Sequence, residues 1–465
     1  MKINIASNEV IHFIGIGGIG MSGLAQIMKN MGFKIQGSDL NRNKNTERLT
    51  KSRIKVFIGH QKVNLKKATM VVISSAIKKN NKELKEARRK KIPVFRRGEM
   101  LANIVALKKN IVVTGSHGKT TTTSLVANIL VEAGLDPTVI NGGVINSLKN
   151  TAQLGKGEWA VIESDESDGS FLKLPITYSI VTNVDKEHLD YYGNFEKLKK
   201  SFGTFIEKTP SFGKSIICID DKNLKSILSK CKTENFLTYG FEKNSNYQIA
   251  NVKKNINYTI FDLLVNFTGD KIFKIKNIKV NLIGDHNVSN TTAAIVIALN
   301  LGIKISKIKK ALKKFLGIQR RFTKVFSVGK KKFYDDYAHH PTEIRAVIKG
   351  AKEVYKDRKI ICVFQPHRYS RVKSLKKEFA LSFKDCDRVV LCPVYPAGEK
   401  IRYNFNQNSF SKSIAEKSKI QVINIKKQED LKNYFKKNLL DNEMVICMGA
   451  GSISNWIREI GDELR

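Results

Sequence analysis

The sequence has few cysteines, and none of them has the spacing of a metal site or a redox motif. The six are scattered, without a C-x-x-C pair, at Cys218, Cys231, Cys362, Cys386, Cys392 and Cys447. A structural zinc site or a disulfide framework needs closely spaced or regularly repeated cysteines. Scattered thiols are typical of proteins in a reducing compartment, so we expect a cytoplasmic protein.

Long hydrophobic runs are also absent. The apolar stretch 10–21 is interrupted by four glycines and has no clear cleavage site, so it does not resemble a signal peptide. No apolar run approaches the roughly 20 residues of a membrane span, and we therefore expect no membrane insertion. The 465 residues are 42% hydrophobic, which is enough for several cores and favours about three domains.

Acidic residues are scarce relative to basic ones. The chain has 42 Asp and Glu against 82 Lys and Arg, a formal charge of +40. Such an excess is compatible with a nucleic-acid-binding ATPase. The lysines, however, are spread along the whole chain among many Ile and Asn, which is typical of a solvated surface and a compositional bias. The nearest basic cluster, 88–91, has no interleaved aromatic residue, so we predict no nucleic-acid partner.

Short apolar runs alternate with helical patterns along most of the chain, which predicts parallel α/β sheets. We divide the chain into domains at 1–107, 108–318 and 319–465. Within the second domain, the polar, strand-rich stretch 247–282 interrupts the alternation and predicts antiparallel hairpins, with Gly269-Asp270 as a turn. Helices are expected to follow at about 287–301 and 305–314.

The most informative motif is a glycine-framed turn between an apolar run and a helical pattern, at residues Thr114, Gly115, Ser116, His117, Gly118, Lys119, Thr120 and Thr121. Backbone N–H groups of such a turn close around phosphate oxygens at a helix N-terminus. Lys119 can reach the terminal phosphates, and the Thr120 hydroxyl can bind Mg²⁺. The loop is shorter than G-x-x-x-x-G-K-[ST]. The alternative is a tight strand-to-helix turn with an incidental lysine.

A second glycine turn, G-x-G-x-x-G, follows the first predicted strand. It comprises Gly15, Gly17, Gly18 and Gly20. Such glycines allow the turn, the approach of a diphosphate and close helix packing. Asp39 comes about 20 residues later, where an acid can accept a hydrogen bond from a ribose hydroxyl. The motif alone fits a dinucleotide cofactor or any nucleotide diphosphate, or a purely structural turn.

Two polar segments each follow a predicted strand of the second domain. The stretch 163–168 contains four carboxylates, and Glu163, at the end of its strand, is the natural Mg²⁺ ligand. His188 lies among acids in 185–190 and can bind a second metal ion or orient a carboxylate. An acidic surface loop and an incidental histidine are the alternatives.

Further polar clusters occur later in the chain. Asn287 and Asn290 open a helix, where an amide can pair with an adenine edge or simply cap the helix. The third domain carries arginines suited to carboxylate or phosphate, which otherwise would be solvated surface residues. These side chains are Arg320, Arg321, Arg368 and Arg371, with His339 and His340 nearby in sequence. No ligand set of metal spacing surrounds the two histidines, so we reject a zinc site.

Taken together, these motifs closely resemble those of the Mur ligase family over nearly the whole chain, and the family's short phosphate loop accounts for the spacing. The resemblance implies a Rossmann-like UDP-binding domain, a central P-loop ATPase domain with an added antiparallel strand region, and a C-terminal Rossmann-like domain. It implies catalytic roles for Lys119, Glu163, His188 and Arg321, metal binding by Thr120, Glu163 and His188, and nucleotide binding by the phosphate loop with His286, Asn287 and Asn290. It further implies UDP-sugar binding by Gly15, Gly17, Gly18, Gly20, Asp39 and Ser75, and amino-acid binding by His339, Arg368 and Arg371.

The implied reaction is the ATP-dependent joining of the lactyl carboxylate of UDP-N-acetylmuramate to L-alanine, through an acyl phosphate. The implied cofactor is Mg²⁺, as two ions, with ATP as a substrate, and the implied state is a monomer or weak homodimer. A sister ligase that attaches a whole peptide is the nearest alternative, and a dinucleotide-binding oxidoreductase is a more distant one. The resemblance also suggests a correspondence between Lys199 and a lysine that some sister ligases carbamylate, and we leave its modification open.

Overall fold

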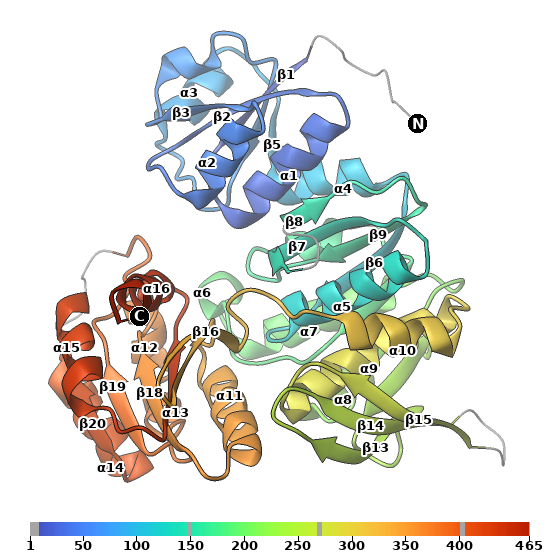
Figure 1. Cartoon of the computed structure of the whole chain (residues 1–465). Helices are drawn as coiled ribbons and strands as arrows, with labels where there is room; N and C mark the ends of the chain where they lie inside the picture. The colour runs from blue at the N-terminus through green and yellow to red at the C-terminus, as the bar shows by residue number, and fades with distance from the viewer. Residues whose placement is uncertain (1–8, 147–149, 267–271, 400–404, 465) are drawn as a thin grey trace. The chain divides into compact units, whose positions relative to one another are not determined.

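The computed structural model describes residues 9–146, 150–266, 272–399 and 405–464. The chain forms two compact units. One runs from the N-terminus to Val252 and includes Phe261–Val280 and Ser289–Leu316, and the other comprises Lys253–Ile260, Asn281–Val288 and Gly317 onward. Each unit is built from mostly parallel sheets with helical connections, so the predicted α/β class is confirmed (Figure 1).

The first sheet has five parallel strands in the order β3-β2-β1-β4-β5. Its strands are β1 (Val10–Ile14), β2 (Lys34–Asp39), β3 (Lys55–Ile58), β4 (Met70–Ile73) and β5 (Val94–Arg96). Its helices are α1 (Ile19–Asn30), α2 (Lys44–Lys51), the 3₁₀ turn η1 (Lys62–Leu65), α3 (Lys82–Arg89) and α4 (Arg97–Val105). The strand order reverses between β1 and β4, and ligands of such sheets bind outside the carboxyl ends of the strands at this point.

The second sheet has ten strands, ordered β15-β14-β13-β12-β11-β10-β6-β9-β7-β8. They are β6 (Lys109–Thr114), β7 (Thr138–Ile145), β8 (Asn150–Gln153), β9 (Trp159–Glu163), β10 (Tyr178–Val181), β11 (Ser215–Cys218), β12 (Phe236–Gly240), β13 (Tyr247–Lys254), β14 (Thr259–Val265) and β15 (Phe273–Val280). Its helices are α5 (Lys119–Glu132), η2 (Ser170–Lys173), α6 (Leu189–Tyr192), α7 (Phe195–Glu207), α8 (Lys222–Leu228), α9 (Asp285–Asn300) and α10 (Ile305–Lys314). The parallel strands β9, β6 and β10 place three strand ends side by side.

The added strands of this sheet agree with the predicted hairpins. β13 and β14 are neighbours joined by only four residues, with the Asn255 N–H donating to the Tyr258 carbonyl. So short a connection allows only an antiparallel pair, because parallel strands need a crossover of a dozen or more residues. The predicted turn at Gly269-Asp270 lies outside the described residues. The predictions missed β3, β8 and β12, which are short or only partly buried strands, and also the eight-residue strand β7.

The third sheet has six strands in the order β16-β17-β21-β18-β19-β20, all parallel except the β16–β17 pair. They are β16 (Thr323–Val328), β17 (Lys331–Asp336), β18 (Lys359–Phe364), β19 (Arg388–Leu391), β20 (Gln421–Asn424) and β21 (Glu443–Met448). The helices are α11 (Pro341–Val354), α12 (Tyr369–Ser374), α13 (Lys376–Ala380), α14 (Gln407–Ser418), α15 (Gln428–Asn438) and α16 (Ile453–Leu464). Alternate residues of β18 and β21 belong to different apolar clusters, so the sheet is buried on both faces. The β16–β17 hairpin was not predicted.

None of the helices in the described residues is long and apolar enough to cross a bilayer.

Candidate active site

The turn between β6 and α5 depends on both of its glycines. Gly115 and Gly118 have φ values of +129° and +83°, in the region that favours glycine. A Cβ atom would collide with the Thr182 hydroxyl at the first position and with the Asn290 amide oxygen at the second. Asn290 also accepts a hydrogen bond from the Thr122 hydroxyl at 3.2 Å. The structure therefore packs Asn290, from α9, directly against the turn.

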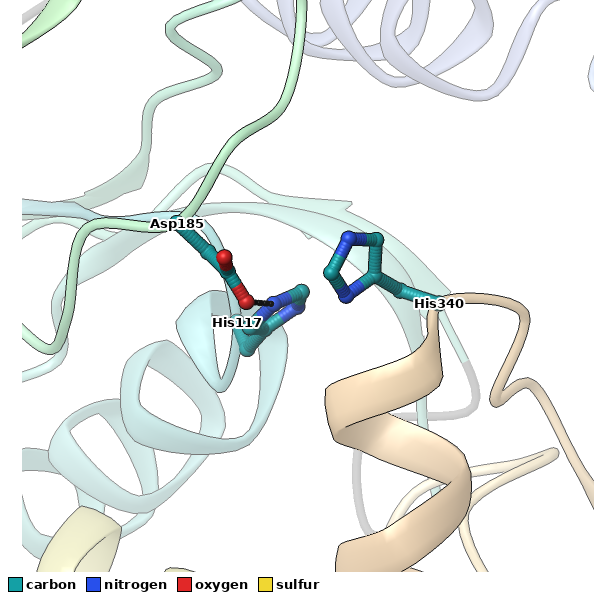
Figure 2. Close-up of side chains that lie close together, drawn as sticks. All are labelled: His117, Asp185 and His340. Atoms are coloured by element: carbon teal, nitrogen blue, oxygen red, sulfur yellow. Dashed lines mark hydrogen bonds and ion pairs between the residues drawn. The ribbon is translucent and has the colours of Figure 1, made fainter. Parts of the chain in front are cut away.

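The segment after β10 holds this turn in place. Asn183 accepts hydrogen bonds from the N–H groups of Ser116 and His117, at 3.0 and 2.8 Å. The Asp185 N–H donates to the Ser116 hydroxyl at 2.8 Å, and the Asp185 carboxylate lies 3.2 Å from Nε2 of His117 (Figure 2). Two amides of the turn are thus engaged by Asn183, which the sequence did not indicate. The first N–H groups of α5, which have no partner within the helix, remain to face phosphate oxygens.

Lys119, the first residue of α5, is held by a buried carboxylate. Its Nζ lies 2.8 Å from Oε2 of Glu166 and 2.5 Å from the Gly115 carbonyl. Burial alone would lower the pKa of Lys119, but the charges of Glu166 and Asp165 outweigh it and raise the pKa above its usual value. Lys119 is therefore a cation at the phosphate loop. Glu166, which is fully buried, was not selected among the four carboxylates of its segment.

Thr120 and Glu163 meet at the ends of neighbouring strands. The Thr120 hydroxyl lies 3.0 Å from Oε1 of Glu163, and the Gly142 N–H donates to Oε2 at 2.7 Å. β6 and β9 are paired in parallel, which brings the start of α5 and the end of β9 to one edge of the sheet. A hydroxyl and a carboxylate beside a phosphate loop form the oxygen donor set that Mg²⁺ prefers. The residues therefore fit the predicted metal site.

The third predicted metal ligand belongs to a different group of side chains. His188 has ligand atoms within 4.8 Å of those of Asp165 and Glu166. Burial would raise the pKa of Asp165, but Lys119 and His188 outweigh it and lower the pKa. The structure thus groups His188 with the carboxylates around Lys119, whereas Thr120 contacts Glu163. Lys199 pairs with Glu196 at 3.0 Å on α7, and no contact indicates its modification.

The first glycine turn is fixed by the end of β2. Gly15 has φ +82°, and the Ser38 carbonyl accepts hydrogen bonds from the N–H groups of Gly15 and Ile16, at 2.8 and 3.0 Å. The Asp39 carboxylate accepts one from the Gly17 N–H at 2.8 Å. In this state Asp39 therefore supports the turn itself.

Other members of the predicted UDP-sugar site differ in their surroundings. A Cβ at Gly20 would lie 3.3 Å from the Arg97 side chain, and one at Gly18 would meet only ordinary contacts. A tighter contact occurs on β2 at Gly37, where a Cβ would lie 2.6 Å from the Phe13 carbonyl oxygen. Ser75 is exposed just after β4.

The third sheet gathers the predicted amino-acid-binding residues at the carboxyl ends of β17 and β18. The His339 and His367 rings are 5.7 Å apart, and Nη1 of Arg371 lies 3.3 Å from Nδ1 of His367. Burial, aided by His339 and by Arg371, Arg368 and Arg320, lowers the pKa of His367 to about 3, so this ring is neutral. Arg368 is exposed and has φ +69°, a sparsely populated backbone conformation that costs a non-glycine residue about 1–3 kcal/mol and that concentrates at functional sites.

Arg320 and Arg321 both stack on the Tyr337 ring, at 4.8 and 5.2 Å from its centroid. Arg320 also donates to the Gly449 carbonyl at 2.7 Å and faces the buried Asp335 at 3.9 Å. The ion pair of Arg321 with Glu343 is a distant one, at 3.9 Å. Arg320 therefore has a structural role, and Arg321 is the better placed of the two to meet a ligand.

The start of α9 carries the remaining nucleotide-binding candidates. Burial lowers the pKa of His286 to about 4, so its ring is neutral at physiological pH. Asn287 donates to the Ile283 carbonyl at 2.8 Å, which closes the first turn of the helix. An N-cap side chain accepts hydrogen bonds from backbone N–H groups, whereas this amide donates to a carbonyl, so the contact is not an N-cap hydrogen bond.

Residues of all three sheets match models of known protein families. Residues 10–109 match the model "Mur ligase family, catalytic domain", 113–298 match "Mur ligase middle domain", and 320–451 match "Mur ligase, glutamate ligase domain". The UDP-N-acetylmuramate–L-alanine ligase of Pelagibacter ubique is 57% identical over 460 residues, which cover 99% of each chain.

Two solved structures are similar over the whole length. The UDP-N-acetylmuramate–alanine ligase of Thermotoga maritima has a TM-score of 0.83 and 28% identity over 97% of this chain and 98% of its own. A murein peptide ligase of Psychrobacter arcticus, at 22% identity and a TM-score of 0.73 over 98% of both chains, shares the fold. The chain therefore belongs to the Mur ligase family.

Proposed function

We propose that this protein joins L-alanine to UDP-N-acetylmuramate with the cleavage of ATP to ADP and phosphate, the step that starts the peptide of peptidoglycan. The observation that carries the proposal is the phosphate loop, whose Lys119 ammonium and Thr120–Glu163 pair lie at one edge of the second sheet. The 57% identity to a ligase with this activity supports the choice of substrates.

The reaction proceeds in two steps. A carboxylate oxygen of the lactyl group attacks the γ-phosphorus of ATP, and ADP leaves. The amine of alanine then attacks the acyl carbon, the amine loses a proton, and phosphate departs as the amide forms. Lys119 and the amides at the start of α5 stabilise the charge on the transferred phosphoryl group.

Thr120 and Glu163 would hold a Mg²⁺ ion, which supplies charge neutralisation to the nucleotide phosphates when it is bound. We assign a second ion to His188, whose ligand atoms lie close to those of Asp165 and Glu166. Glu166 of this group also pairs with the Lys119 ammonium. Asn290, with His286 and Asn287, would contact the nucleotide. Arg321 would steady the phosphates.

The first and third domains would bind the other substrates. We assign the UDP-sugar to the glycine turn of β1, with Asp39 and Ser75, and the carboxylate of alanine to His339, Arg368 and Arg371. We retain domain limits of 1–107, 108–318 and 319–465, close to those of the three family models. We further propose that the protein works in the cytoplasm as a monomer or weak homodimer.

Phosphate release tests the proposed function directly. The assay combines Mg-ATP with UDP-N-acetylmuramate and, in turn, each amino acid or the peptide that the sister ligase uses. We expect release to require the UDP-sugar and to be fastest with L-alanine. Fastest release with the peptide would instead assign the recycling activity. Release that ignores both but increases with DNA or RNA would overturn the proposal.

Replacing Arg368 by glutamine tests the assigned amino-acid site. An arginine–carboxylate hydrogen bond contributes roughly 1.5–3 kcal/mol, so we expect the KM for L-alanine to rise about 10- to 100-fold. The KM for ATP should change little. The control is Arg358→Gln, a surface arginine that donates to the Lys330 carbonyl. An unchanged KM for alanine in Arg368→Gln would remove this residue from the site.

A further inference from the structure

A carboxylate is buried in the first domain, where it contacts the strand that supports the glycine turn assigned to the UDP-sugar. Glu83, on α3, has no exposed surface. Its Oε2 lies 2.5 Å from the Ser38 hydroxyl, 3.2 Å from Nδ1 of His60 and 3.5 Å from Nε2 of His12. Its Oε1 accepts hydrogen bonds from the Asn64 side chain at 2.6 Å and from the Gln61 N–H at 3.3 Å. Burying a carboxylate destabilises the folded state unless hydrogen-bond donors surround it, and the donors around Glu83 meet this requirement.

These hydrogen bonds connect the Glu83 carboxylate to the end of β2 and to the segment that follows β3. Ser38 is the penultimate residue of β2, and its carbonyl accepts hydrogen bonds from the two N–H groups that shape the glycine turn. His60 and Gln61 follow β3, and the Asn64 side chain also donates to the Gly59 carbonyl. The Glu83 side chain of α3 thus fixes the end of β2 and the segment after β3, and through the Ser38 carbonyl it also supports the turn after β1.

The proton positions follow from counting donors. The Gln36 amide nitrogen donates to the Asn64 carbonyl and to Nδ1 of His12, so the His12 proton lies on Nε2, toward Glu83. The one proton of the Ser38 hydroxyl goes to Glu83. The Ser38 hydroxyl oxygen and the Glu83 carboxylate then have no proton to give to Nδ1 of His60, and both can only accept a hydrogen bond from it. Nδ1 of His60 must therefore carry a proton. In the neutral ring, Nε2 of His60 is therefore a hydrogen-bond acceptor.

His60 has the exposure and the position of a residue that contacts a ligand. Its side chain is 10% exposed, and among the described residues Nε2 of His60 has no partner. In Rossmann-like sheets the diphosphate of a bound nucleotide lies at the turn after the first strand, and the ribose lies at the acidic residue that ends the second strand, here Asp39. The base then extends toward the end of the third strand, where His60 lies beside Gly59, whose N–H donates to the Asp39 carbonyl.

We propose that Nε2 of His60 accepts the N3–H of the uracil base, and that Glu83 is the positioning residue that keeps His60 in the accepting tautomer. The proposal rests on UDP-N-acetylmuramate being the substrate. N3–H is the only ring N–H of a uracil nucleotide, so an acceptor here selects for uracil by a single hydrogen bond.

Binding of UDP and of UDP methylated at N3 tests the proposal in a double-mutant cycle, measured by calorimetry on the full chain. In the parent protein the methyl group should weaken binding about tenfold or more, because it removes the donor. In His60→Ala, UDP should bind about tenfold more weakly and the methyl penalty should largely vanish. A penalty of equal size in both proteins would mean that another group reads N3, which overturns the assignment.

Glu83 and its neighbour Glu86 form a matched pair for the positioning role. Glu86 lies on the same helix, is also buried and pairs with Arg89 at 2.7 Å. We expect Glu83→Asp to retain more UDP binding than Glu83→Gln, and Glu86→Gln to bind UDP normally. The KM for ATP should be unchanged in all three. If Glu83→Gln has a lower melting temperature but discriminates between the two nucleotides as the parent does, Glu83 is structural only. If the parent protein does not bind UDP at all, the proposed function itself fails.

Discussion

Replacing Lys119 by alanine is expected to reduce ligation by about a thousandfold or more. The ammonium is the cation of the phosphate loop, and the transition state of phosphoryl transfer spreads negative charge over the oxygens that it faces. UDP-sugar binding, which we assign to the first domain, should remain measurable. Steady-state phosphate release and calorimetric binding of UDP-N-acetylmuramate would provide the two readouts.

This substitution has a structural consequence that needs its own control. Glu166 would lose its counter-charge while fully buried, and breaking such a pair costs about 3–5 kcal/mol. The double variant Lys119→Met/Glu166→Gln removes both charges and keeps the packing, so it should recover stability without recovering activity. Lys109→Ala, a surface lysine paired with Glu158, should behave as the parent. An active Lys119→Ala protein would show that the loop does not act on phosphate.

Glu163→Gln is expected to lower kcat about a hundredfold and to raise the Mg²⁺ concentration needed for half-maximal activity. The carboxylate contributes the negative charge of the proposed metal site, and an amide of the same shape retains only a neutral oxygen. Its contacts with Thr120 and Gly142 allow the amide to fit without a cavity. A Mg²⁺ titration of phosphate release would measure both effects.

The matched control is Glu158→Gln, one residue before the same strand. Glu158 is exposed and pairs with Lys109 at the surface, so its loss should leave the Mg²⁺ dependence unchanged. Equal shifts in the two variants would indicate a general effect of surface charge. An unchanged Mg²⁺ dependence in Glu163→Gln would remove this carboxylate from the metal site and leave the acids near His188 as the alternative.

The sequence alone was sufficient for features that depend on neighbours in the chain. The strand, turn and helix around Lys119 could be predicted, because an apolar run, glycines needing positive φ and a helical pattern follow one another directly. The same holds for the turn at Gly15 and for α10, whose predicted bounds equal the observed ones. The three α/β domains followed from the alternation of such segments, and the whole-chain similarity to Mur ligases agrees with them.

Tertiary structure decided which side chains face one another. Lys119 pairs with Glu166, Thr120 with Glu163 and His117 with Asp185, over separations of 47, 43 and 68 residues. Four carboxylates within six residues cannot reveal which of them is buried beside a lysine. Nothing near Asn183 in the sequence indicates that it holds the phosphate loop.

The buried network of Glu83 is the clearest example of this division. In the sequence, Glu83 is one charge in a lysine-rich helix, and Ser38 and His60 are unremarkable polar residues at strand ends. Strand order brings the ends of β2 and β3 together, and α3 packs so that its carboxylate reaches both. Local patterns determined the elements and the chemical types at their ends. Which strand ends lie together depends on contacts between residues far apart in the chain, and only the folded structure defines these contacts. The hydrogen-bond partners of each side chain, and the positions of the protons, follow from them.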